Sequence, residues 1–340
     1  MDLRPDPLQQ RLRDAVDTVL TRTGELSAQL ATIGVPSLNA PERLGGLALG
    51  LSADIVVNER LGYALEPLGC YRETAFALDM LDSDDVPTEH LAEILADLYK
   101  GTRHAVVVGA RGPAGIQVKP GGRLWGESEP LPRGAIGLCV VRTAHGGGGE
   151  WRLVVPEPGT CVTESIDHFG MPASRLRFEG AASQPLPVTA AHWECALAAA
   201  RVRQAALLLG IADRIVDVAR AHVNTRTQSG KPLVERQTVA HRLALLIGEA
   251  DGWRLVLNKT AWELDRDDHP NTAAVLAVAG EHAQLASRTA LQLHGVRGML
   301  AHSTAASVYR MVAVESVRLG TPTDLWLEAA STTRHLTPDT

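Results

Sequence analysis

Apolar residues recur at three- and four-residue steps along several stretches of the chain, which is the spacing of one face of an α-helix. This pattern covers residues 8–33 and returns in three long segments, at 190–225, 234–265 and 271–294. Between these stretches, residues 104–188 carry short apolar runs separated by glycine and proline, which is typical of short strands. The pattern therefore predicts helices, then strands, then helices again.

This order predicts an α+β protein with three domains. We expect an N-terminal helical domain at residues 1–102 and a small middle β-domain, a barrel or sandwich, at 103–188. The remaining residues, 189–340, are expected to form a C-terminal helical domain. Three long helices followed by a short one predict a four-helix bundle for that domain.

Composition narrows the possible functions. The 340 residues are 45% apolar, which is enough for one or two buried cores, and the net charge is -6. An acidic chain without a Lys/Arg-rich run is a poor candidate for nucleic-acid binding. The four cysteines form no CxxC pair, which favours a reduced, cytoplasmic protein without a zinc site. The polar N terminus is unlike a signal peptide, and charged residues interrupt the apolar stretches, so we expect no membrane span.

Two short segments carry the candidate chemistry. Residues 226–232 read Arg-Thr-Gln-Ser-Gly-Lys-Pro, and residues 292–298 read Gln-Leu-His-Gly-Val-Arg-Gly. The first is by itself typical of an ordinary turn between two helices. Together they resemble the Arg-x-Gln-Phe-Gly-x-Pro and Gln-x-x-Gly-Gly-x-Gly segments of the acyl-CoA dehydrogenase family. The loop at residues 39–46 and the helical Glu-Arg-Leu-Gly at 59–62 are also similar to segments of that family.

The resemblance implies FAD bound between the β-domain of one subunit and the helical bundle of its neighbour. Arg226 would reach the pyrophosphate, because a guanidinium can bind phosphate oxygens through two parallel hydrogen bonds. The other matched cofactor positions are Gln228, Ser229, Gln292, Gly295 and Thr321. The family usually has Phe at the position of Ser229, and its second glycine is Val296 here.

The resemblance also implies a Glu that removes the α-proton of an acyl thioester while hydride leaves the β-carbon. This chain has Leu319 at the usual position of the base and Ala200 at the less common one. Glu315, about one helical turn from Leu319, is either a displaced base or a solvated residue on a helix surface. Arg201 either orients substrate or pairs with an acid across the bundle. His294 is interpreted as a packing or cofactor-side residue rather than a catalytic one.

The predicted β-domain departs from the family pattern at the flavin. The family's Thr-Glu-Pro loop falls at residues 109–115, where the Thr that hydrogen-bonds the flavin is missing. The family's Trp-Ile-Thr/Ser element falls near residues 130–132, and the nearest tryptophan is Trp125. The glycine run within residues 144–150 predicts a flexible hairpin loop, not a phosphate loop, because no Gly-Lys-Ser/Thr follows it.

Three functions remain open. The chain could be one subunit of a heteromeric acyl-CoA or acyl-carrier-protein dehydrogenase, lending Arg226, Gln228 and Gln292 to FAD held by a base-bearing partner. It could be a homodimeric or tetrameric dehydrogenase that uses Glu315 or another displaced acid. It could instead be an FAD-free scaffold that catalyses an elimination, cyclisation or rearrangement, or that binds an acyl or polyketide intermediate. Fold alone does not decide among these functions. We expect no metal site.

Overall fold

A computed structural model describes residues 6–66, 69–83, 85–86, 89–112, 115–144 and 149–334. By its internal contacts the chain divides into two compact units. The first comprises Met1–Asp14, Leu51–Pro67 and Arg201–Thr340, and we call it the helical unit. The second comprises Ala15–Gly50 and Leu68–Ala200, and we call it the sheet unit because it contains the β-domain.

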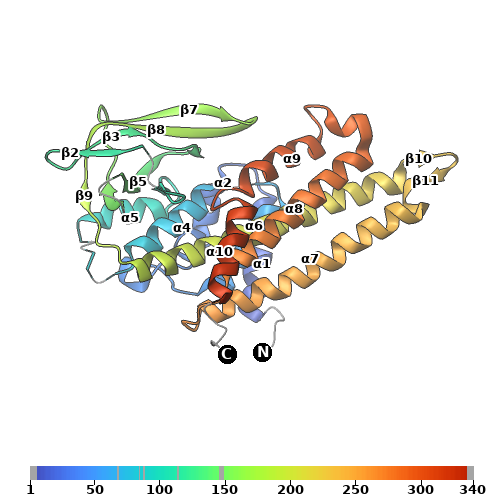
Figure 1. The fold of residues 1–340 in the computed structure, drawn as a ribbon, viewed down its shortest axis with the longest axis horizontal. Coiled ribbons are helices and arrows are strands. Elements are labelled where there is room, and N and C mark those ends of the chain that lie inside the picture. Colours follow the sequence, from blue (N-terminus) through green and yellow to red (C-terminus); the bar gives the residue numbers. More distant parts are fainter. Residues whose placement is uncertain are drawn as a thin grey trace. The chain divides into compact units, whose positions relative to one another are not determined.

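The order of the elements confirms the predicted fold class, with helices first, then strands, then helices (Figure 1). The α-helices are α1 (Pro7–Leu20), α2 (Leu26–Thr32), α3 (Leu51–Tyr63), α4 (Gly69–Leu81), α5 (Ala92–Tyr99), α6 (Ala190–Thr225), α7 (Gln237–Leu264), α8 (Thr272–His294), α9 (Thr304–Glu315) and α10 (Pro322–Arg334). Short 3₁₀ helices are η1 (Val35–Ser37), η2 (Glu42–Leu44), η3 (Glu89–Leu91), η4 (Leu233–Glu235) and η5 (Gly295–Met299). The strands are β1 (His104–Val108), β2 (Gln117–Lys119), β3 (Arg123–Glu127), β4 (Leu131–Pro132), β5 (Ile136–Thr143), β6 (Glu150–Val154), β7 (Cys161–His168), β8 (Met171–Ala182), β9 (Gln184–Pro185), β10 (Thr227–Gln228) and β11 (Lys231–Pro232).

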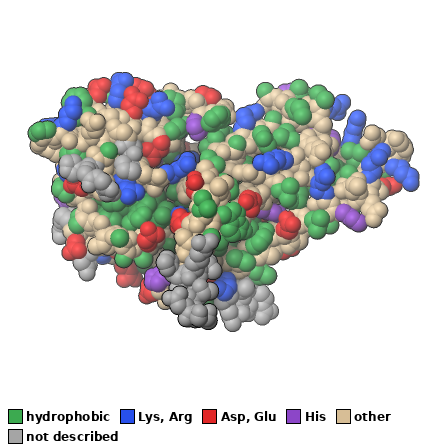
Figure 2. All heavy atoms as spheres, in the orientation of Figure 1, with side chains coloured by type: hydrophobic (Ala, Val, Ile, Leu, Met, Phe, Trp, Pro, Cys, Tyr) green, Lys and Arg blue, Asp and Glu red, His purple; other side chains and the backbone are tan. Residues whose placement is uncertain are grey.

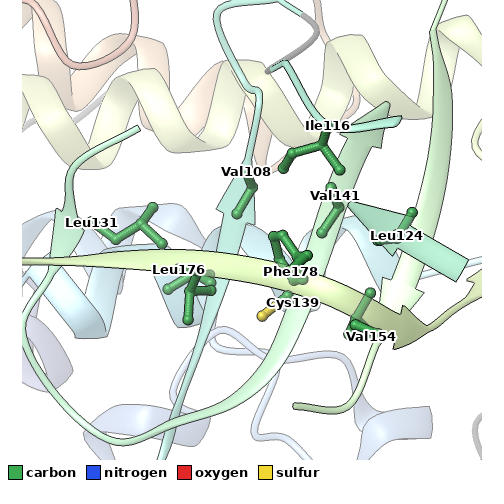
Figure 3. Packing of buried hydrophobic residues seen from close by; sticks show 11 residues of the cluster. Val108, Ile116, Leu124, Leu131, Cys139, Val141, Val154, Leu176 and Phe178 are labelled. Carbon is green, nitrogen blue, oxygen red and sulfur yellow. The ribbon is translucent and has the colours of Figure 1, made fainter. Parts of the chain in front are cut away.

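The β-domain is a sandwich of two sheets. One sheet has the order β1-β5-β6-β9, and the other has the order β2-β3-β8-β4 with β7 also paired to β8. Alternate residues of a strand face the same side, so Val106 and Val108 of β1 point into one core. Figure 3 shows how side chains from both sheets meet there, among them Leu124, Cys139, Val141, Leu176 and Phe178. Burial of these apolar side chains holds the sandwich together.

Helix α6 contributes Arg201–Thr225 to the helical unit. By length and composition it could cross a membrane, but 89% of its most apolar window is buried inside the protein. That burial is typical of the core helix of a bundle. Figure 1 shows α6, α7 and α8 running side by side, with the β10–β11 hairpin at one end of α6.

Helices α3 and α6 cross at two glycines. A Cβ on Gly62 of α3 would lie 2.2 Å from the carbonyl oxygen of Leu207, and a Cβ on Gly210 of α6 would lie 2.1 Å from that of Glu59. Non-bonded carbon and oxygen atoms cannot approach so closely. Both positions therefore need a residue without a Cβ, and their pairing brings two helix backbones into direct contact.

A buried ion pair lies at the same crossing. Arg203 of α6 donates from its Nε to Oδ2 of Asp54 on α3, and both side chains are fully buried. Asn58, one turn further along α3, donates from Nδ2 to the main-chain oxygen of Asp54 at 2.9 Å. Because neither charge reaches water, each depends on the other for its solvation.

One prediction concerns His104, at the start of β1 in the sheet unit. His104 is 5% exposed, and this burial lowers the pKa of its imidazole to about 4. The unfolded chain then binds more protons than the folded one between about pH 4 and 6.5, so stability falls as the pH falls through that range. Between pH 7 and pH 5 we expect His104 to account for a loss of about 2 kcal/mol in the free energy of unfolding.

Urea denaturation at pH 7 and pH 5 measures this loss. His104→Gln is expected to reduce the pH dependence, whereas the same change at His90, an exposed residue of the sheet unit, should leave it unchanged. An identical pH dependence in His104→Gln and the wild type would contradict the prediction.

Candidate functional site

A two-residue hairpin at the end of α6 carries the first motif. Strands β10 and β11 pair Gln228 with Lys231 across the turn. Ser229 and Gly230, the two turn residues, have φ of 55° and 78°, and positive φ at both positions is the type I′ geometry that fits a tight hairpin. Gln228 and Ser229 are both exposed. The turn therefore presents its polar side chains to solvent.

Arg226 lies between the helix and this hairpin. Its main-chain N–H donates to the carbonyl oxygen of His222 at 2.8 Å, which continues the last turn of α6. Its side chain is exposed, and the described part of the chain gives it no acidic partner. A guanidinium in this state keeps its fork of donors available for an anion.

The second motif lies at the end of α8. Gln292 accepts a hydrogen bond at Oε1 from Nη1 of Arg242 on α7, at 2.6 Å. Gly295 ends the helix with φ 61° and ψ -145°, a backbone conformation that favours glycine. The residue after it, Val296, is 80% exposed. Gln292 thus keeps its amide donors free to turn outward, while its oxygen is fixed by Arg242.

Two histidines join the ends of α6 and α8. The rings of His222 and His294 stack with their centroids 4.2 Å apart and an interplanar angle of 20°. His294 donates from Nδ1 to the carbonyl oxygen of Ala290 at 2.7 Å, since only the nitrogen can donate in that contact. Burial and the charges of His294, Arg226 and Arg297 lower the pKa of His222.

The pairing of these histidines was not predicted from the sequence. The available signal was that His222 precedes Arg226 by four residues and that His294 follows Gln292 by two. Residues four apart share one face of a helix, so His222 could have been assigned to the same end of the bundle as Arg226.

Positive charge gathers at this end of the helical unit. From Arg226 to Arg242 the sequence has four Lys or Arg residues and one acidic residue, and from Gln292 to Arg310 it has two arginines and no acidic residue. Figure 2 shows Lys and Arg side chains crowding the end where Figure 1 labels β10 and β11. The chain as a whole carries a net charge of -6, so this end is a local cationic surface suited to an anion.

Thr321 does not lie at this end. Its hydroxyl accepts from the main-chain N–H of Asp324 at 3.2 Å and donates to Oδ2 of Asp324 at 2.6 Å, so it caps α10. The nearby Trp326 donates to Glu281 of α8 at 2.9 Å. Gln292 lies eleven residues further along α8, roughly 17 Å at the rise of an α-helix. The structure thus gives Thr321 a helix-capping role and separates it from Arg226, Gln292 and Gly295.

Glu315 is buried, so the expectation of a solvated surface residue is wrong. It is 3% exposed at the end of α9. Its Oε2 accepts from Gln204 Nε2 at 3.0 Å and from Arg318 Nε at 3.1 Å, and its Oε1 accepts from Arg318 Nη2 at 3.2 Å. Both carboxylate oxygens are therefore engaged by donors, and proton abstraction from a substrate would require these contacts to break.

Arg201 pairs with an acid across the bundle, which was one of the two roles expected for it. Its Nη1 and Nη2 donate to the two carboxylate oxygens of Glu328 on α10, at 2.6 and 2.7 Å. The Arg201 side chain is 7% exposed, while that of Glu328 is 45% exposed. A bidentate pair of this kind ties α10 to α6.

The loop after β1 is held by a contact within the β-domain. The N–H of Gly109 donates to Oε1 of Glu129 at 2.8 Å. Trp125 lies on β3 with Lys119 Nζ 4.5 Å from the centre of its ring, which gives it a role on the sheet surface. Residues 113–114 of this loop and 145–148 of the glycine run lie outside the described residues.

Comparisons with known proteins agree with the motifs and the fold. Residues 191–323 match the family model described as Acyl-CoA dehydrogenase, C-terminal domain. Acyl-CoA dehydrogenase FadE28 of Mycobacterium tuberculosis is 28% identical over 328 residues, covering 88% of this chain and 89% of that protein. The ChsE4-ChsE5 complex from the same organism superposes with a TM-score of 0.81 at 22% identity and full coverage of both chains. PigA with FAD and proline superposes with a TM-score of 0.81 at 18% identity, covering 99% of this chain and 100% of that one. Residues 191–323 belong to the acyl-CoA dehydrogenase family, and the chain as a whole is similar to members of that family in sequence and fold.

Proposed function

We propose that this chain is one subunit of a heteromeric acyl thioester dehydrogenase. In this proposal a partner of the same family holds most of the FAD and supplies the catalytic base, and this chain supplies the phosphate-side contacts. The observation that supports this proposal most is that Arg226 is exposed and has no acidic partner among the described residues. The same chain has Leu319 and Ala200 at the two positions where the family places its catalytic Glu. The substrate class is an acyl group carried by coenzyme A or by an acyl-carrier protein.

The residues of the helical unit fit the phosphate end of FAD. The Arg226 guanidinium can make two parallel hydrogen bonds to phosphate oxygens. Gln292 can add its amide donors, since its oxygen already accepts from Arg242. Gly295 has no side chain between its backbone and an approaching ligand, and apart from its own chain neighbours no described atom lies within 4 Å of where its Cβ would be. Gln228 and Ser229 are exposed on the same turn as Arg226.

The β-domain fits the flavin ring poorly, which is the reason for a partner. The N–H of Gly109 is occupied by the Glu129 carboxylate, and the loop lacks the Thr of the family pattern. A carboxylate in that place would also oppose the negative charge that a reduced flavin carries. One of the similar structures is a complex of two proteins, ChsE4 and ChsE5, and this precedent supports an assembly of unlike subunits.

The desaturation removes a proton from the α-carbon and a hydride from the β-carbon. FAD, when bound, supplies the hydride acceptor. The proton needs a carboxylate within hydrogen-bond reach of the α-carbon, and neither Leu319 nor Ala200 can take it. Arg226, Gln228 and Gln292 in this chain would bind and orient the phosphates, and the partner's carboxylate would take the proton.

The occupied Gly109 N–H also favours a second candidate function. If no partner restores the flavin site, the scaffold would work without FAD, on a non-redox elimination, cyclisation or rearrangement, or as a binder of an acyl or polyketide intermediate. Flavin content separates the two candidates, because only the dehydrogenase needs the cofactor.

Replacing Arg226 by alanine tests the proposed function. The chain would be co-expressed with a family member from its own organism that keeps the loop Thr and the catalytic Glu, and flavin absorbance would be measured on the purified complex. We expect Arg226→Ala to lower flavin retention by at least tenfold, because a charge-assisted bidentate contact to phosphate is lost.

Arg236→Ala is the matched control. Arg236 is an exposed arginine near the start of α7, so its removal changes the net charge equally. An equal loss in both variants would point to a general charge effect. Unchanged flavin retention in Arg226→Ala would contradict the assignment of the phosphate end to this chain.

A further inference from the structure

The stacked histidines have no role in the proposed function so far. His222 lies in the last turn of α6 and His294 ends α8, and the centroids of their stacked rings are 4.2 Å apart. His222 is one helical turn from Arg226, whose N–H donates to its carbonyl oxygen. His294 lies between Gln292 and Gly295 in the sequence. Each histidine of the pair is therefore a close neighbour in sequence of a residue proposed to bind the phosphates.

Charges around the pair oppose its protonation. Burial, His294 on α8, Arg226 just after α6 and Arg297 on η5 lower the pKa of His222. The C-terminal ends of α6 and α8 carry partial negative charge, which works in the opposite direction. Two stacked imidazolium rings would repel each other. Protonation of one ring therefore disfavours protonation of the other, and the pair favours a single imidazolium.

The hydrogen bond of His294 decides where that proton can go. Its Nδ1 already carries a hydrogen, which it donates to Ala290 O. The lone pair of the neutral ring is therefore on Nε2. A proton taken from solvent would bind there or on His222, and the resulting cation could serve as a further donor to an anion.

We propose that His222 and His294 are part of the phosphate site of Arg226, and that the pair takes up one proton from solvent when a pyrophosphate group binds. This inference rests on the proposed function, because it takes the ligand to be the pyrophosphate of a dinucleotide. The bound anion offsets the repulsion among Arg226, Arg297 and the imidazolium. Phosphate binding and protonation then favour each other, as two linked equilibria must.

Nuclear magnetic resonance of the chain with ¹³C-labelled histidine tests the proposal. The ring signals would be titrated with pH in sodium pyrophosphate and in sodium chloride of equal ionic strength. His222→Gln and His294→Gln assign the two signals. We expect pyrophosphate to raise the titration midpoint of the pair by about half a pH unit or more, which corresponds to at least threefold tighter binding to the protonated pair.

His269 is the internal control, because it is an exposed histidine between α7 and α8, outside the cationic stretch from Arg226 to Arg242. Its midpoint should not move, and Arg226→Ala should abolish the movement of the pair. Equal midpoints in the two salts would overturn the proposal, and so would an equal rise for His269, which would show a general effect of the anion.

The two proposals can fail separately. If the purified complex loses flavin on Arg226→Ala but the midpoints of the pair do not move, the inference about the histidines fails and the proposed function stands. If the midpoints move with pyrophosphate while flavin retention is indifferent to Arg226, the histidines bind phosphate and the dehydrogenase subunit proposal fails.

Discussion

Alanine at Gly62 or Gly210 is expected to destabilise the protein by about 3 kcal/mol or more, because the added methyl group meets backbone and not a flexible side chain. The new Cβ would overlap a carbonyl oxygen of the facing helix at 2.2 Å in the first case and 2.1 Å in the second. Relief requires α3 and α6 to move apart, which would open the core around the crossing. Urea denaturation followed by circular dichroism measures the loss.

Two other glycines supply the control for this prediction. Gly248 and Gly252 lie on α7, where no described atom outside the neighbouring backbone of α7 would come within 4 Å of an added Cβ, and alanine is the better helix former. Alanine at either position is therefore expected to stabilise the protein by about 0.5 to 1 kcal/mol. A Gly62→Ala protein as stable as the wild type would contradict the close helix crossing.

Breaking the Asp54–Arg203 pair is the second large effect. Asp54→Asn removes the negative charge and leaves a guanidinium with 0% exposure, so we expect a loss of about 3 to 5 kcal/mol. The double variant Asp54→Asn, Arg203→Met removes both charges and should recover part of that loss. The free energies of unfolding of the two single variants and the double variant measure the coupling.

An exposed pair in the same unit provides the comparison. Lys259 donates to Glu263 on the surface of α7, where the lysine side chain is 55% exposed. Lys259→Ala is expected to change the free energy of unfolding by less than about 1 kcal/mol. If Asp54→Asn costs no more than Lys259→Ala, the buried pair does not stabilise the helix crossing.

Much of the fold follows from local patterns. The helical spacing of apolar residues and the short runs between glycines indicate which segments form helices and strands, because each pattern reflects the period of one element. The cap on α10 was also present in the sequence, since Thr321 is followed three residues later by Asp324. The family resemblance also implies a cofactor contact for Thr321, which stays a prediction.

The site depends on contacts that local patterns do not contain. Arg201 pairs with Glu328, 127 residues later in the chain. Glu315 is buried because Gln204 and Arg318 surround it, although its neighbours in sequence are compatible with a surface helix. The stacking of His222 on His294 depends on how two helix ends meet. Such pairings are set by tertiary packing, so one sequence alone leaves them open.

The direct test of a split flavin site is the absorbance spectrum of the purified chain, alone and in complex with a base-bearing family member, each after incubation with FAD and gel filtration. We expect no flavin band in the lone chain and a flavin band in the complex. The complex made with the Arg226→Ala variant should lose that band. A flavin band near full occupancy in the lone chain would contradict the proposal, because it would show that this β-domain holds the cofactor without a partner of another kind.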